Sequence, residues 1–331
     1  MRSRPIDLPQ DCLPDDARAR HTALRDYFCD KDAEVVRTAA GWRLDLGWPG
    51  GVDRHVDREL EVAFDWWGGG VVRETMAHAR RRDGRFLLTL YDTWTLHSWS
   101  QWAANAGTSQ GNSVVVLHVD DHFDLAPPRL IADTSGLRDA ISGAKFDFLQ
   151  PASVQAAILS GALGMGSFMT PFLHFAPEAE VRHLRQPPKT RRTVDYAFRR
   201  TTVQDTLLHP NAPRPAIQLI ETEGASGPGS YRLAVDVDDW LNEIGEGPIL
   251  LHIDMDYFNN RYDGDSDWAE RPERLDPSLS TILRKIDELT DALRTAKVLN
   301  RLEDIVIAFS PGFFPAEFWA VADARLRAGL T

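Results

Sequence analysis

Three side chains that can bind a metal ion alternate directly after a strongly apolar stretch of the chain. Residues 113–119 are rich in valine, and Asp120, His122 and Asp124 follow them. In an extended chain, residues two positions apart point to the same side. We therefore expect two carboxylates and one imidazole to converge at the carboxyl end of a strand.

A second apolar stretch ends in the same way. Residues 248–253 lead into Asp254 and Asp256, again separated by one residue. Four carboxylates packed together without cations would raise each other's pKa and resist ionisation, which divalent metal ions would relieve. Oxygen-rich sites with few imidazoles suit manganese or magnesium better than zinc, so Mn²⁺ is the expected cofactor. One Asp-x-Asp pair can instead cap a helix, but two acidic clusters on matched strands favour a metal site.

Strands and helices must alternate along the chain to position these motifs. Hydrophobic periodicity predicts strands at 60–64, 85–91, 113–119, 248–253 and 305–309. It predicts helices at 72–81, 98–106, 153–163 and 278–299. Residues 17–28 are expected to be helix or loop, and turns are expected at 48–51 and 107–112. This alternation is typical of an α/β fold with a mostly parallel sheet, in which sites form at the carboxyl ends of strands.

Two regions depart from this alternation. Residues 1–60 mix charge, proline and glycine without clear periodicity, and we expect them to form an N-terminal extension. Residues 180–231 contain the five prolines between Pro187 and Pro215 and a glycine-rich segment at 224–229. We expect this second region to be an insertion lying over the domain.

The composition restricts the partners. The 331 residues carry a formal net charge of −12, which argues against binding nucleic acid and favours cationic ligands. Cys12 and Cys29 lie far from the acidic motifs, so neither a disulfide framework nor a thiolate metal site is expected. No apolar run is long enough to span a membrane, so we expect a cytoplasmic protein without membrane partners. A homo-oligomer is possible on this sequence.

The motifs resemble those of the ureohydrolases in the arginase/deacetylase-like superfamily, and more narrowly those of the peptide arginase branch. Ureohydrolases combine an Asp-x-His-x-Asp motif, a later Asp-x-Asp motif and an earlier histidine, which here is His97, 23 residues before Asp120. The resemblance spans about residues 86–319 and implies a three-layer α/β/α fold that holds two manganese ions. It implies one ion held by His97, Asp120, Asp124 and Asp254, and a second held by His122, Asp256 and the bridging Asp120 and Asp254.

Several neighbouring residues are less determined. His118 and His252 each precede a bridging aspartate by two positions, so they either hydrogen-bond a ligand carboxylate or are buried for structural reasons. Asp92 and Asp121 are expected to lie outside the ligand set. Five tryptophans near the first motif could form the wall of a peptide groove, although core packing is favoured: Trp66, Trp67, Trp94, Trp99 and Trp102.

Two departures from ordinary arginases concern the substrate. The polar loop that grips free arginine is replaced by residues 125–130, which include two prolines, and this suits an arginine whose α-groups are already in peptide bonds. Where arginases place a guanidinium-binding glutamate after the last strand, the chain has no acid before Glu317. Glu317 is therefore the candidate guanidinium partner, with Asp263 and Asp265 as alternatives, and Asp124 and Glu317 are the expected catalytic residues.

The resemblance thus implies that residues 1–331 form a single metallohydrolase domain. Its expected activity is manganese-dependent hydrolysis of arginine side chains within a peptide, which gives ornithine and urea. The same fold can host other substrates, so a hydrolase of a small guanidine or an acylated amine is an alternative. A non-catalytic metal-stabilised binding protein and a phosphoesterase are two others.

Overall fold

The structure is a computed structural model that describes residues 5–28, 31–48, 55–106, 114–134, 136–224, 227–264, 267–271 and 275–331. Its α-helices are α1 (Ala17–Phe28), α2 (Leu60–Trp67), α3 (Trp94–Ala106), α5 (Pro151–Ser160), α6 (Met169–Phe175), α7 (Val237–Leu241), α8 (Leu279–Thr295) and α9 (Trp319–Leu330). None of these described helices is long and apolar enough to cross a membrane.

A nine-stranded sheet forms the centre of the molecule. Its order is β12 (Pro213–Glu221), β11 (Val194–Gln204), β13 (Ser230–Ala234), β10 (Glu180–Leu184), β6 (Val115–Val119), β14 (Ile249–Asp254), β15 (Leu302–Ala308), β5 (Phe86–Thr89) and β4 (Arg80–Asp83). The run from β13 to β5 is parallel, and β4, β11 and β12 are antiparallel. The expected α/β class with a mostly parallel sheet is confirmed, while the arginase-like fold stays a prediction.

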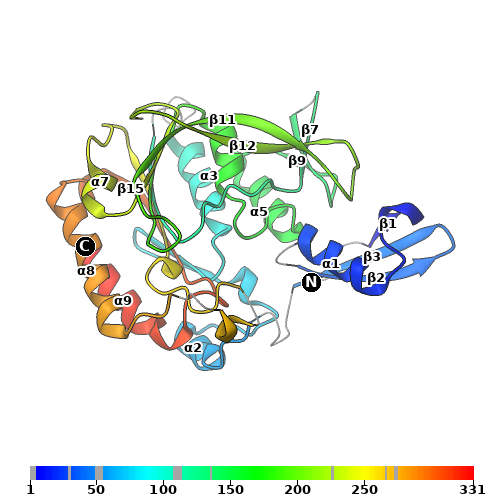
Figure 1. The fold of residues 1–331 in the computed structure, drawn as a ribbon, viewed down its shortest axis with the longest axis horizontal. Coiled ribbons are helices and arrows are strands. Elements are labelled where there is room, and N and C mark those ends of the chain that lie inside the picture. Colours follow the sequence, from blue (N-terminus) through cyan, green and yellow to red (C-terminus); the bar gives the residue numbers. More distant parts are fainter. Residues whose placement is uncertain are drawn as a thin grey trace.

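Helices cover both faces of this sheet. Helices α7, α8 and α9 pack together on one side, and α3 packs with α5 on the other (Figure 1). Helix α8 shows why: Ile282, Ile286, Leu289 and Leu293 recur at helical spacing and are all buried. Strands β6 and β14 lie between the two layers and are buried along their whole length, as expected of parallel strands covered on both faces.

Three of the predicted elements differ from the structure. Residues 60–64, expected as a strand, begin helix α2, in which Leu60, Ala63, Phe64 and Trp67 are buried at helical spacing. Residues 72–81, expected as a helix, form a turn, a short 3-10 helix (Met76–His78) and the start of edge strand β4. The helix expected at 98–106 begins earlier, at Trp94. The turn expected at 107–112 and residues 49–51 lie outside the described residues.

The region 180–231 is only partly the expected insertion. Strand β10 is fully buried and pairs in parallel with both β13 and β6, so it belongs to the interior of the central sheet. The remainder forms the long antiparallel pair β11 and β12, which extends the sheet at its edge and arches over the helices (Figure 1). The prolines at 187–188 fall in the loop between these two parts.

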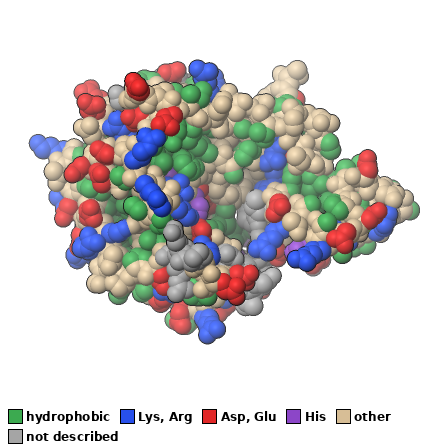
Figure 2. All heavy atoms as spheres, in the orientation of Figure 1, with side chains coloured by type: hydrophobic (Ala, Val, Ile, Leu, Met, Phe, Trp, Pro, Cys, Tyr) green, Lys and Arg blue, Asp and Glu red, His purple; other side chains and the backbone are tan. Residues whose placement is uncertain are grey.

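The N-terminal residues form a small lobe beside the main body (Figures 1 and 2). Strands β1 (Ile6–Leu8), β2 (Asp32–Thr38) and β3 (Gly41–Gly47) form an antiparallel sheet in the order β1-β3-β2. Residues 17–28, expected as helix or loop, form helix α1, which packs on this sheet through Leu24 and Phe28 around a separate apolar cluster that Leu207 joins from the main body. A third sheet contains β7 (Leu130–Asp133), β8 (Gly136–Asp139) and β9 (Lys145–Phe146).

Candidate metal centre

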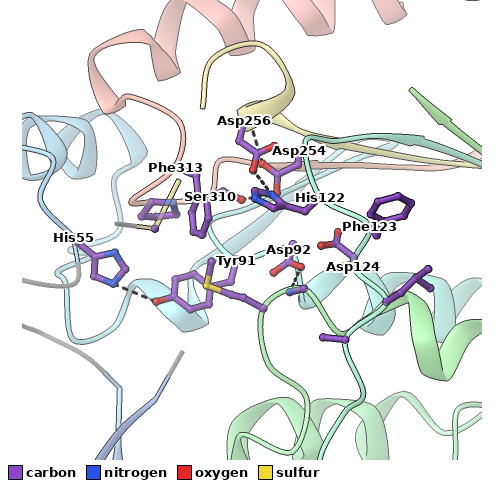
Figure 3. Close-up of a pocket in the computed structure, with 16 residues that line it drawn as sticks. His55, Tyr91, Asp92, His122, Phe123, Asp124, Asp254, Asp256, Ser310 and Phe313 are labelled. Atoms are coloured by element: carbon purple, nitrogen blue, oxygen red, sulfur yellow. Dashed lines mark hydrogen bonds and ion pairs between the residues drawn. The ribbon is translucent and has the colours of Figure 1, made fainter. Parts of the chain in front are cut away.

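The two acidic motifs meet because their strands are parallel neighbours. Strands β6 and β14 pair with His118 opposite His252, so Asp120 and Asp254 emerge at the same edge of the sheet. Strands β15 and β5 continue the sheet and bring Ser310 and Asp92 to this edge (Figure 3). The carboxyl ends of four adjacent strands thus surround one cavity.

The first motif converges through turns in the backbone. The Asp120 Oδ1 atom accepts a hydrogen bond from the backbone N–H of His122 at 2.5 Å. Asp124 adopts a positive φ of 54°, outside the extended region. Asp121 faces elsewhere, because its carboxylate is bound by Lys189 at 2.7 Å and by Asn260 at 2.6 Å. The expected convergence is therefore present, but simple alternation along an extended strand is not its cause.

The second motif uses the same local turn. The Asp254 Oδ1 atom accepts from the backbone N–H of Asp256 at 3.1 Å, and its Oδ2 atom accepts from the Ser310 hydroxyl at 2.5 Å. Asp256 then contacts the imidazole Nδ1 of His122 at 2.9 Å. Asp254 also caps the 3-10 helix Met255–Tyr257, the alternative role considered for such a pair. Capping uses one oxygen only, so it does not compete with a role in the site.

Two buried carboxylate oxygens of this centre have no hydrogen-bond partner among the residues that the structure describes: Asp120 Oδ2 and Asp124 Oδ2. The two residues are 1% and 6% exposed. The nearest imidazole nitrogens, of His118 and His252, lie 3.8 Å from Asp120 Oδ2, beyond hydrogen-bond range. An ionised carboxylate buried without a partner is strongly unfavourable. A cation bound by these oxygens would remove the cost.

The electrostatics of the site indicate the same need. Burial, together with Asp256 and Asp254, raises the pKa of Asp120 well above its usual value. Burial and the neighbouring Asp120 raise the pKa of Asp124 in the same way. Against the opposing effect of burial, Asp256 and Asp120 raise the pKa of His122. Without cations, the protein can hold these groups together only by taking up protons.

Five of the six expected ligands come together, and they group into possible ion positions. The ligand atoms of His118, Asp120, Asp124 and His252 lie within 4.8 Å of one another, as do those of Asp120, His122 and Asp256. Asp254 lines the same cavity as Asp124 and Asp256. These buried histidine and aspartate groups could hold a metal ion.

His97 is the expected ligand that the structure does not bring to this centre. It lies within α3, where its ring contacts Trp94 with 5.7 Å between centroids, and it is not among the residues that line the cavity. Burial and the nearby Arg80 and Arg82 lower its pKa to about 4. The cationic side chains beside it also make this position unfavourable for a metal ion.

A row of three histidines lies beneath the centre. His183, His118 and His252 are in register on β10, β6 and β14, and all are fully buried. The His118 Nε2–H donates to the carbonyl of His122 at 3.1 Å, and the His183 Nε2–H donates to the carbonyl of Asp120 at 3.0 Å. The row therefore fixes the backbone of the first motif instead of its carboxylates.

The hydrogen bonds determine the tautomer of each ring in the row. Because carbonyls only accept, His118 and His183 carry their protons on Nε2 and accept on Nδ1. The Nδ1 atom of His118 accepts from Nδ1 of His252 at 3.1 Å, and that of His183 accepts from the Tyr231 hydroxyl at 2.7 Å. Burial lowers the pKa of all three histidines, which keeps them neutral. Sequence reasoning missed His183 because its strand was assigned to the insertion.

The cavity above the carboxylates has a volume of about 420 Å³. Aromatic side chains of Tyr91, Phe123 and Phe313 stand around it, with Leu125 and Met165 (Figure 3). None of the five tryptophans lines it, and Trp94 and Trp99 are fully buried, so core packing, the favoured use, holds for these two.

Glu317 lies outside this cavity. Its carboxylate accepts a hydrogen bond from Arg261 at 2.7 Å, so it is paired within the protein. Of the two alternatives, Asp265 lies outside the described residues. Asp263 contacts His122 Nε2 at 3.1 Å and is also bound by Lys189 and Arg271. Asp263 thus orients the imidazole of His122 from the side opposite Asp256.

Asp92 is a cavity residue that sequence reasoning placed outside the ligand set. It is 3% exposed and lines the cavity with Asp124 and Asp254 (Figure 3). A signal was present in the sequence, because Asp92 follows the predicted strand 85–91 as Asp120 follows 113–119.

No protein-family model matches the chain, and no curated protein does either. Arguments about function therefore depend on the geometry of this centre.

Proposed function

We propose that the protein is a metal-dependent hydrolase that acts on the guanidinium group of arginine side chains within a peptide, releasing urea and leaving ornithine. The observation that carries the metal dependence is the pair of buried, unpartnered oxygens on Asp120 and Asp124. Divalent ions bound there would activate water for hydrolysis near neutral pH and polarise the bond to be cleaved. We propose Mn²⁺, two ions per chain, because the donors are mostly carboxylate oxygens.

The protein groups around the ions have separate tasks in this proposal. Asp120 belongs to two of the groups of possible ligands, and Ser310 holds the Asp254 carboxylate through its hydroxyl. His122 is oriented by Asp256 on one ring nitrogen and by Asp263 on the other. Such restraint keeps ligands in place before metal or substrate arrives, which reduces the reorganisation required during the reaction.

The cavity suits a planar cation. The rings of Tyr91, Phe123 and Phe313 can lie against a guanidinium, which stacks on aromatic faces and is attracted by their electrons. The concentration of carboxylates at the floor of the cavity also favours a positively charged head group. Both features support arginine as the reacting side chain.

The loop after Asp124 favours a peptide over free arginine. Leu125 and Ala126 line the cavity, and the carbonyls of Pro127 and Pro128 are occupied by the guanidinium of Arg214. The side chains of Leu125 and Ala126 thus offer no polar group to an α-ammonium or α-carboxylate. Leaving such charges without partners costs several kcal/mol, whereas an arginine within a peptide has no such charges.

Urea release tests the proposal directly. The manganese-loaded protein is incubated with an arginine-containing peptide or with free arginine at equal concentration, and Asp120→Asn serves as the inactive control. We expect the peptide to be converted, free arginine to react at least about tenfold more slowly, and the variant to release no urea. Equal or faster reaction of free arginine would overturn the peptide assignment, and no urea from any substrate would overturn the ureohydrolase assignment.

One observation favours a second candidate, a hydrolase of acylated amines. Since His97 lies away from the centre, the imidazole donor of the cavity comes from His122, and a single ion on Asp120, His122 and Asp256 would suffice for amide hydrolysis. The same assay with an acyl-lysine peptide separates the two candidates, because it would release a carboxylic acid instead of urea.

A further inference from the structure

We propose that Asp92 is a metal ligand, and that it forms an all-carboxylate position for a divalent ion together with Asp120, Asp124 and Asp254. In this arrangement Asp92 takes the place that the ureohydrolase resemblance assigns to His97. The inference rests on the proposed metal dependence and is independent of the substrate.

The first argument is the position of Asp92 in the sheet. Strand β5 ends at Thr89 and pairs in parallel with β15, which pairs in turn with β14 and its terminal Asp254. Asp92 therefore leaves the sheet at the same edge as the acidic motifs. It is buried, and its carboxylate lies beside that of Asp124 in the cavity (Figure 3).

A glycine holds Asp92 and Asp124 next to each other. The backbone N–H of Gly166 donates to Asp92 Oδ2 at 2.9 Å, while a Cβ added to Gly166 would lie 3.7 Å from Asp124 Oδ1. The two carboxylates therefore flank one short piece of backbone. Gly166 has a positive φ of 70°, a conformation that glycine adopts without strain.

The unpartnered oxygens supply the second argument. Asp124 Oδ2 and Asp120 Oδ2 are buried without a hydrogen-bond partner in the described part of the chain. Buried carboxylate oxygens without a protein partner, beside the further carboxylates that line the cavity, form the environment that hard divalent cations occupy.

The surroundings of His97 supply the third argument. Helix α3 starts at Trp94, so His97 lies in the first turn of the helix, whereas Asp92 lies in the segment that leaves the strand. Arg80 and Arg82 are close enough to His97 to lower its pKa. An ion beside His97 would meet these positive charges, and an ion beside Asp92 meets carboxylates.

The proposed positions differ in chemistry. Asp92, Asp120, Asp124 and Asp254 offer only oxygen, whereas the position formed by Asp120, His122 and Asp256 includes a nitrogen. Oxygen-only sites accept Mg²⁺ readily, and an imidazole favours a transition metal. Excess Mg²⁺ should therefore displace Mn²⁺ from the first position and leave the second occupied.

Metal content and electron paramagnetic resonance test the inference. The full chain and its Asp92→Asn, His97→Ala and Asp304→Asn variants are loaded with Mn²⁺ alone, then analysed for metal per chain and for coupling between ions. Asp304 is a matched control, because it is a buried aspartate bound by Ser98 and Arg82 away from the cavity. We expect about two coupled ions in wild type, His97→Ala and Asp304→Asn, and about one uncoupled ion in Asp92→Asn.

Each other outcome has a definite meaning. Two ions retained in Asp92→Asn, or loss of an ion in His97→Ala alone, would overturn the inference while leaving a metal-dependent hydrolase intact. A wild-type protein that binds one ion would also overturn the inference and leave the metal-dependent hydrolase intact. A wild-type protein that binds no ion would overturn both proposals. If Asp92→Asn does not fold, Mg²⁺ competition on the wild type decides: retention of about one Mn²⁺ supports the inference, and displacement of neither or both contradicts it.

Discussion

Asp120 is held in place through one carboxylate oxygen, and the other oxygen is left for a ligand. The backbone N–H of His122 fixes Oδ1, and Oδ2 has no hydrogen-bond partner among the described residues. Asp254 is held more tightly, because the backbone of Asp256 and the hydroxyl of Ser310 each bind one oxygen. Ser310 has a positive φ of 44°, a costly conformation for a residue with a side chain. Such strain at a cavity residue fits a position selected for function.

Asp263, the second carboxylate that contacts the His122 ring, gives a prediction at the scale of single residues. Against the effect of burial, hydrogen bonds from His122 and Lys189 hold the pKa of Asp263 well below its usual value, so it stays ionised and directs the His122 ring. Asp263→Asn should weaken Mn²⁺ binding about 10- to 100-fold, the usual result of removing such a partner. Titration of the metal-free protein with Mn²⁺ measures this. Glu317→Gln is the control and should bind Mn²⁺ as wild type does, and equal weakening in both variants would contradict the assignment.

At the scale of elements, the loop after Asp124 is fastened from the β11–β12 hairpin. Arg214 donates to the carbonyls of Pro127 and Pro128, and Arg129 on the same loop donates to the carbonyls of Tyr27 and Gly161. The loop is therefore held by groups outside the metal centre. Its shape can affect the substrate without affecting the ions.

Arg214→Ala should separate these two properties. Removing the guanidinium leaves buried carbonyls without partners, which costs about 1–3 kcal/mol and loosens the loop. We expect thermal stability and kcat/KM for the peptide to fall while metal content stays at the wild-type value. Arg192→Ala is the control, because Arg192 lies just before this hairpin and forms an exposed pair with Glu221 at its end, and it should change neither quantity. Loss of metal from Arg214→Ala would place the loop in the metal site itself.

The elements also show where sequence reasoning succeeds. Strands β6 and β14 were readable because their buried apolar runs end in acidic residues, and α8 because its apolar residues keep one period over four turns. Helix α2 was missed because the predicted strand ended at Phe64 and so left out Trp67, which completes the helical spacing of the buried residues. Helix α3 begins at Trp94, directly after Thr93, a residue type favoured at helix N-caps, so the sequence carried a signal that His97 lies inside a helix. Asp92 follows a predicted strand as Asp120 does, but it stands alone and not in an Asp-x-Asp or Asp-x-His pattern, so its place beside the acidic motifs became visible only in the fold.

At the scale of the whole molecule, the metal-free protein should lose stability as pH rises. Burial and mutual repulsion raise the pKa of Asp120, Asp124 and Asp254 well above their usual values, so the folded protein binds more protons than the unfolded chain. That stabilisation is present at low pH and is lost as the pH rises through the raised values. The lowered pKa of the buried histidines acts in the opposite direction, but only below about pH 6.5.

Thermal unfolding between about pH 6.5 and 8.5 therefore reports the groups whose pKa is raised, which are these carboxylates together with His122. The metal-free protein should be less stable at the higher pH, by about 1.4 kcal/mol per pH unit for each proton released. Saturating Mn²⁺ should remove most of this dependence, since the ions replace the protons. Asp120→Asn should show a shallower slope without metal and little response to Mn²⁺. A metal-free wild type that gains stability over this range would contradict the charge distribution described here.

The row of histidines beneath the centre has a consequence for how the chain selects its fold. Strand β6 is apolar on both faces, so burial alone does not distinguish its correct alignment from one shifted by a residue. The imidazoles of His118, His183 and His252 do distinguish the two, because each needs a partner that only the native alignment supplies. A slip would leave polar rings unsatisfied between the helix layers. The histidines thus favour one alignment of β10, β6 and β14, and the same alignment brings the two acidic motifs together.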